Sequence, residues 1–163
     1  MPSSQHLRSI RVWLSLFILG LILSGITAFP LEHETAWMVR FLTAHPILPT
    51  GIIIWIDRVY QALYQDSVHA PFLAYGTDWL AFAHLVLAVA FFGPFIDPIR
   101  NKWVLQFGVI ACAGVFALAL IAGPIRGIPV VWRLIDCSFG VFGAIPLLIA
   151  LRKTAELEAS TAG

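Results

Sequence analysis

Four ionisable side chains lie inside long apolar stretches of the sequence, where a charge is costly. Asp78 and His84 share one such stretch, and Arg133 and Asp136 share another. Ionisable groups within a membrane span are rare, and they commonly belong to a charge network, a ligand site or a proton path. These four residues are therefore the first candidates for chemistry.

Asp78, Arg133 and Asp136 are expected at similar depth, about 6–11 Å inside the outer ends of their spans at a rise of about 1.5 Å per residue. Arg133 and Asp136 are three residues apart and can pair on one helix face, and Asp78 can join them from a neighbouring helix. We expect Arg133 to contact at least one of these acids. The cluster is either a charge network that ties two spans together, or a polar pocket open to the outer side. In such a pocket Arg133, helped by Arg126, would hold an anionic headgroup or substrate.

His84 is expected deeper in its span, on a face that also carries Thr77, Ala81 and Ala88. Small and polar residues favour contact with another helix over contact with lipid. A hydrogen-bonded histidine between helices is one interpretation, and proton transfer, quinone contact and metal ligation are the others. Because no second histidine lies within a span, bis-histidine haem ligation is not expected.

No motif in the sequence identifies a reaction. The spacing of the acids and histidines in the connection between the first two spans matches no metal-ligand pattern; they are Glu32, His33, Glu34, His45 and His69. The cysteines, Cys112 and Cys137, form no C-x-x-C pair and are expected to pack as small apolar residues. No nucleophile elbow, Walker motif or dinucleotide fingerprint is present. The catalytic residues are thus unknown, and neither a metal nor a cofactor is predicted.

The composition predicts the kind of helices that must position these side chains. Of 163 residues, 60% are hydrophobic and 12% are charged, and the mean hydropathy is +0.88. A small domain has too much surface to hide so many apolar side chains from water, and about 20 apolar residues make one helical crossing. The sequence therefore predicts an all-α membrane protein, a four-helix transmembrane bundle forming one integral membrane domain over residues 1–163. The predicted spans are about 10–29, 71–92, 103–122 and 129–151.

The segment from about residue 31 to 69 is too polar to cross, and Pro46 and Pro49 interrupt it. Apolar residues at helical spacing predict two short amphipathic helices here, around residues 35–43 and 51–65. Such helices lie on a membrane surface or cap a bundle. We expect this segment to be extracytoplasmic.

Small residues recur at helical spacing along the last two spans. Gly140, Gly143 and Ala144 continue the face of Arg133 and Asp136, and Gly108, Ala111, Cys112 and Ala119 form a similar surface on the third span. Small side chains let helix backbones approach closely. Both surfaces are expected to be tightly packed helix interfaces.

Basic residues next to the span ends predict the orientation. All of them fall on one side, which should be the cytoplasmic side; they are Arg8, Arg11, Arg100, Lys102, Arg152 and Lys153. Both termini are thus expected in the cytoplasm. The residues beyond the last of these cations, 154–163, are expected to form a frayed polar tail.

Three stretches, residues 71–84, 121–129 and 132–140, give the chain a family resemblance. It resembles a group of small bacterial inner-membrane proteins with four spans and no assigned function. The stretches that carry the resemblance read PFLAYGTDWLAFAH, IAGPIRGIP and WRLIDCSFG. The resemblance covers most of the chain. It implies the four-span topology and a bacterial inner membrane, but no activity, ligand or residue role.

Three functions are compatible with these features. The first is a structural, accessory or ligand-holding component of the bacterial inner membrane, and this one we favour. The second is a membrane-embedded enzyme or redox protein that acts on a lipid-like substrate or a quinone at an outward-facing polar pocket. The third, an oligomeric transporter, lacks the visible half-repeats of many transporter folds.

The partners that these functions imply are the lipid bilayer, a lipid or quinone ligand, and a second copy or another membrane protein. A nucleic acid is not among them. The net charge is +1, and the sequence has no cluster of basic residues. Binding to a phosphate backbone needs such a cluster.

Overall fold

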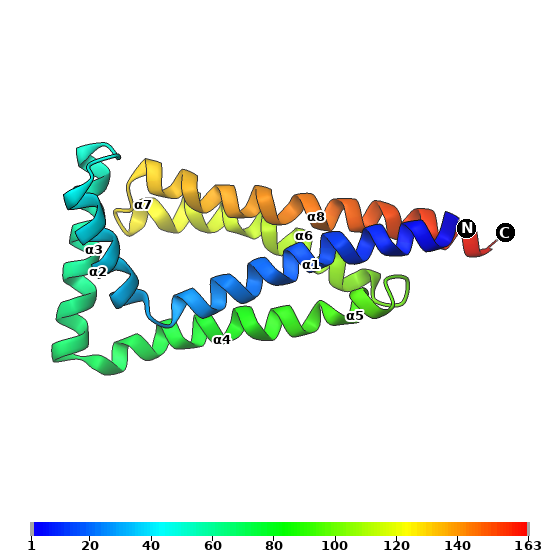
Figure 1. The fold of residues 1–163 in the computed structure, drawn as a ribbon, viewed down its shortest axis with the longest axis horizontal. Helices are drawn as coiled ribbons and strands as arrows, with labels where there is room; N and C mark the ends of the chain where they lie inside the picture. The colour runs from blue at the N-terminus through cyan, green and yellow to red at the C-terminus, as the bar shows by residue number, and fades with distance from the viewer. Residues whose placement is uncertain (1, 163) are drawn as a thin grey trace. The chain divides into compact units, whose positions relative to one another are not determined.

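The computed structural model describes the backbone of residues 2–162 and the side chains of residues 4–160. Every regular element in this part of the chain is a helix (Figure 1), which confirms the predicted all-α class. The order is α1 (Pro2–Ala28), α2 (Leu31–Ala44), α3 (Thr50–His69), the 3-10 helix η1 (Pro71–Leu73), α4 (Ala74–Ala90), α5 (Phe92–Ile96), α6 (Lys102–Ala117), the π-helical turn η2 (Leu118–Ala122), α7 (Gly123–Ile125) and α8 (Val130–Ala162).

Four of the described helical stretches are long and apolar enough to cross a membrane, as predicted: Ser4–Ala28, Pro71–Ile96, Lys102–Ile125 and Val130–Ser160. Only 22% to 28% of the most apolar part of each is buried inside the protein. The remaining apolar surface needs a non-aqueous environment, as the surface of a membrane protein does.

The second candidate span continues beyond its predicted end at about Phe92. Pro94 lies in the first turn of α5, a position where the missing N–H of proline is tolerated. The proline therefore does not end the helical stretch, which reaches Ile96.

The chain forms two compact units, and the single membrane domain stays a prediction. One unit comprises Met1–Gly20 with Ala88–Gly163, and the other comprises Leu21–Leu87. Helices α1 and α4 contribute residues to both units.

In the first unit, α6 packs against α8 along small residues (Figure 1). A Cβ atom placed on Gly140 would lie 2.7 Å from the carbonyl oxygen of Cys112, and one on Gly143 would lie 3.0 Å from the Sγ atom of Cys112. A Cβ atom on Gly108 would meet a methyl carbon of Leu147 at 2.7 Å. These distances confirm the predicted close interface, and they show that three glycines leave no room for a side chain.

In the second unit, the end of α1 packs closely on α4. A Cβ atom on Gly25 would lie 2.9 Å from the carbonyl oxygen of Ala81, and Ala81 itself is fully buried. Helices α2 and α3 pack against each other as a hairpin (Figure 1), with Leu42 and Ile56 buried. The segments predicted as helical around residues 35–43 and 51–65 lie within α2 and α3, which are longer, and neither helix is among the candidate spans; the predicted amphipathic, membrane-surface role stays a prediction.

The predicted polar tail is wrong for residues 154–160. Helix α8 is 33 residues long and continues through this segment. Thr154 is fully buried, and its hydroxyl donates a 2.8 Å hydrogen bond to the carbonyl oxygen four residues earlier. Leu157, one turn later, is only 7% exposed. The tail is therefore a packed extension of the helix.

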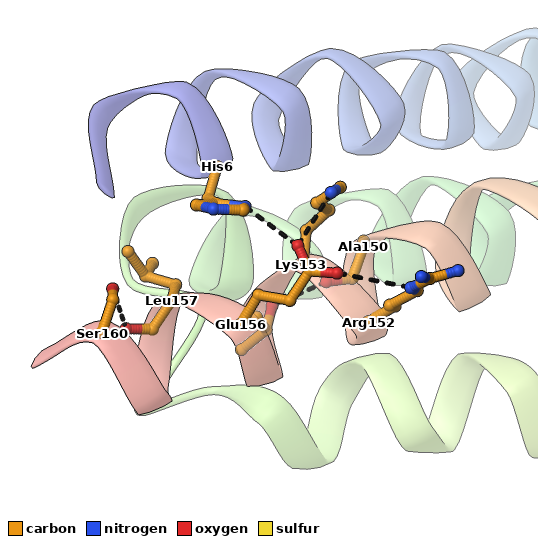
Figure 2. Close-up of polar contacts among 8 residues, drawn as sticks. His6, Ala150, Arg152, Lys153, Glu156, Leu157 and Ser160 are labelled. Atoms are coloured by element: carbon orange, nitrogen blue, oxygen red, sulfur yellow. Dashed lines mark hydrogen bonds and ion pairs between the residues drawn. The ribbon is translucent and has the colours of Figure 1, made fainter. Parts of the chain in front are cut away.

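Charged side chains surround this extension. Figure 2 shows basic groups directed at the carboxylate of Glu156. The groups are Nδ1 of His6 at 3.1 Å, Nζ of Lys153 at 2.8 Å and Nε of Arg152 at 3.3 Å. A further ion pair joins Nζ of Lys102 to Glu158 at 2.6 Å. The contacts of His6 and Lys102 connect α8 to α1 and to α6.

Candidate functional site

A groove of about 210 Å³ lies in the first unit, where the third candidate span turns into the fourth. Apolar side chains form most of its wall, and Arg126 and Asp136 are its charged residues. The lining residues are Val115, Leu118, Ala119, Ala122, Gly123, Arg126, Ile128 and Asp136. We refer to it below as the arginine groove.

The local sequence explains why the helix is irregular here. Pro124 has no N–H to donate to the carbonyl of Leu120, and its ring would clash with that carbonyl in a regular helix. The backbone widens into the π-helical turn η2 just before the proline. Gly127 then takes a φ of +69°, which glycine adopts without strain, and the chain turns into α8. Such π-helical turns are frequent at functional sites.

Arg133 approaches this groove from α8. Its side chain lies across Gly123, since a Cβ atom on that glycine would be 2.5 Å from Cδ and 2.9 Å from Cγ of the arginine. The Nε atom of Arg133 is buried and has no hydrogen-bond acceptor among the described residues. A buried polar group without a partner is costly, and a guanidinium in a membrane span is more so.

Arg133 forms no ion pair with Asp136 in the described part of the chain, so the expected contact with at least one acid now depends on Asp78. Among the side chains of residues 4–160, the ion pairs all involve Glu156 or Glu158. Spacing by three residues allows a pair on one helix, but the arginine side chain extends over Gly123 instead. The contact with Asp78 stays a prediction, because Asp78 belongs to the other compact unit.

Asp78 lines a second groove, of about 300 Å³, within the second unit. Its other lining residues are aromatic: Phe29, Tyr75, Trp79 and Phe82. This aromatic groove was not predicted, although its residues share a pattern that is visible in the sequence. Spacings of three, one and three residues place four of the lining residues on one side of α4. They are Tyr75, Asp78, Trp79 and Phe82.

His84 bonds to its own helix. Its Nδ1 lies 2.8 Å from the carbonyl oxygen of Leu80, and because a carbonyl can only accept, Nδ1 carries the proton in this contact. Ala81 and Ala88 on the same face are buried, so this face of α4 is packed as predicted. The bond to Leu80 satisfies one ring nitrogen without another helix. Nε2 is then the remaining acceptor of the ring.

The structure thus places Arg126 and Asp136 in the wall of one groove and Arg133 against Gly123 of the same wall, with Asp78 and His84 in the other unit. Within the described residues, no three His, Cys, Asp or Glu side chains form a group that could hold a metal ion. Cys112 and Cys137 are free thiols and are buried.

Comparison of the chain with protein-family models, with curated proteins and with solved structures finds no match. The resemblance to small bacterial inner-membrane proteins therefore stays an expectation. The four long apolar helices indicate a membrane protein, and the two grooves are its candidate binding sites.

Proposed function

We propose that this chain is a ligand-holding component of the bacterial inner membrane, and that the arginine groove binds the anionic headgroup of a phospholipid. The observation that carries the proposal is the buried Nε of Arg133, which has no acceptor among the described residues. Its neighbour Gly123 lines the groove, and Arg126 lines it as well. An anion in the groove would give both guanidinium groups the acceptors that the described residues do not provide.

The charges favour an anion over a cation. Arg126 in the wall and Arg133 beside Gly123 are two cations against the one carboxylate of Asp136, so positive charge is in excess around the groove. Guanidinium groups bind phosphate with short, charge-assisted hydrogen bonds, often two at once. The remaining wall is apolar, which suits the first carbons of the acyl chains. A phospholipid supplies both features in one molecule.

The proposed orientation places the groove toward the outer leaflet. The turn from the third to the fourth candidate span, residues 126–129, is opposite the ends that carry the cations at residues 100–102 and 152–153. Cations mark cytoplasmic connections. Both termini are then cytoplasmic, and α2 and α3 are extracytoplasmic.

Labelling at Gln61 tests this orientation. A cysteine at this exposed position of α3 should react with a membrane-impermeant maleimide added to intact spheroplasts, in a variant whose two native cysteines are serines. A cysteine at exposed Arg100 should react only after the membrane is permeabilised. The reverse pattern at the two positions would contradict the orientation and the outward-facing groove.

Lipid retention tests the binding site. We expect the purified protein to retain phosphatidylglycerol over phosphatidylethanolamine in native mass spectrometry. Replacing Arg133 by glutamine should weaken this retention about 10- to 100-fold, because a hydrogen bond to a charged group contributes about 1.5–3 kcal/mol. The replacement of Arg126 should act in the same direction. Melting in the absence of lipid should change little, since neither arginine has an ion pair among the described side chains.

The matched control is Arg58→Gln, which removes one exposed cation from α3 and should leave retention unchanged. Glycerol phosphate distinguishes a free anion from a lipid: displacement of the lipid by this headgroup alone at similar concentration would show that the acyl chains are dispensable. Equal retention by Arg133→Gln and the native protein would refute the proposal. A large loss of melting temperature that Asp136→Asn restores would instead show a charge network.

A further inference from the structure

The aromatic groove of the second unit presents a carboxylate inside an aromatic wall. Asp78 lines it with Phe29, Tyr75, Trp79 and Phe82. The rings of Tyr75 and Trp79 are 6.0 Å apart between centroids, those of Trp79 and Phe82 are 5.8 Å apart, and both pairs are edge-to-face. Tyr75 and Trp79 are 63% and 56% exposed, so a ligand can reach both residues.

The carboxylate of Asp78 is without a counter-ion among the described residues of its own compact unit. Asp78 is the eighth residue of the candidate span Pro71–Ile96, so it lies about two helical turns from the end of the span. An ionised carboxylate at such a depth, against apolar walls, is costly unless a cation accompanies it.

The walls limit which cation fits. Aromatic ring faces attract cations, and this attraction is strongest when the cation is poorly hydrated, as in quaternary ammonium groups. A small metal ion would need several oxygen ligands to replace its water, and the groove offers the carboxylate of Asp78 and the phenol of Tyr75. The groove therefore matches an organic cation whose charge is covered by carbon.

We propose that the aromatic groove is a binding site for lipophilic organic cations of the quaternary ammonium or phosphonium class. The carboxylate of Asp78 neutralises the charge, and Trp79 together with its aromatic neighbours packs against the carbon substituents. This site is separate from the arginine groove, and it does not depend on the anion proposed there.

Tetraphenylphosphonium and tetraphenylborate form the test pair, because they have nearly the same size and shape and opposite charge. Binding to the full-length protein in a maltoside detergent is measured by equilibrium dialysis. We expect saturable binding of the phosphonium and only non-saturable partitioning of the borate. Asp78→Asn, which keeps the shape of the side chain, should weaken phosphonium binding about tenfold or more, and Trp79→Leu should weaken it by a similar factor.

Two controls keep the test specific. Asp66→Asn removes an exposed carboxylate from α3 in the same unit and should leave the affinity unchanged. Asp78→Glu keeps the charge and should retain most of the binding. Equal affinities for Asp78→Asn and the native protein, or saturable binding of the borate at the same site, would overturn the proposal. Failure of the lipid-retention test at Arg133 would leave this result unaffected.

Discussion

Replacing Gly140 by leucine is expected to separate α6 from α8 and to lower the melting temperature in detergent by about 6–12 °C. A side chain at this position meets the carbonyl oxygen of Cys112 at 2.7 Å and the ring of Phe116 at 3.0 Å. A ring can rotate away, but a backbone oxygen moves only with its whole helix. Overpacking costs about 1–3 kcal/mol, and at the upper end this corresponds to about 6–12 °C for a chain of this size.

Gly114→Leu is the matched control, because this glycine lies inside α6 and has nothing within 4 Å of a Cβ atom. It adds the same side chain to the same helix pair, and leucine favours a helix more than glycine by roughly 0.8 kcal/mol. The control protein should melt at or slightly above the temperature of the native protein. Similar destabilisation by both substitutions would mean that added bulk in the detergent-covered surface, and not the helix contact, is responsible.

The four candidate spans could be predicted from the sequence because their signal is a simple one. A stretch of about 20 apolar residues identifies a crossing without knowledge of any contact. Proline is less reliable as an end signal, as Pro94 and Pro124 show. Both prolines stand where the span was predicted to end, and in both cases helical structure continues beyond them, through the first turn of α5 and through the short helix α7.

The glycine stripe was also visible in the sequence, because a small-residue surface is a property of one helix. The surface that this stripe packs against was not visible in the sequence. Spacing places Gly140 and Gly143 on one side of a helix, but only the structure shows that they meet Cys112 of α6. Contacts between helices depend on rotation and register, which local sequence does not encode.

The candidate site was harder to predict, since side-chain direction decides it. Spacing by three residues made a pair between Arg133 and Asp136 reasonable. The arginine instead uses the space that Gly123, ten residues earlier, leaves open. The aromatic groove was missed for a different reason. Tyr75, Trp79 and Phe82 were each plausible as interfacial aromatic residues, and their common face with Asp78 matters only if a groove forms between them.

The polar composition of residues 154–163 led to the wrong prediction of a frayed tail. Alternating charged and small residues are typical of solvated ends, and the sequence alone does not show that another helix lies alongside. Thr154 and Leu157, three residues apart, are buried on one face, and Glu156 faces His6. Removal of this packed face is expected to cause the second large loss of stability.

A chain that ends at Lys153 is expected to melt at least about 5 °C below the native protein. It loses the burial of Leu157, and a buried leucine contributes about 1.5–3 kcal/mol, which corresponds to about 3–12 °C at this chain length. It also loses the buried hydrogen bond of Thr154 and the ion pairs of Glu156 with His6 and of Lys102 with Glu158, which connect the end of α8 to α1 and α6.

A chain that ends at Ser160 keeps all of these contacts and is the control. Both truncated proteins should be compared with the native protein at one scan rate, because membrane proteins often unfold irreversibly and the apparent melting temperature then depends on the rate. Leu157→Ala in the full-length chain separates packing from charge and should reproduce about half of the loss or more. If the chain ending at Lys153 melts at the same temperature as the native protein, the extension of α8 contributes nothing to stability. The segment would then behave as the frayed tail that its polar composition predicted.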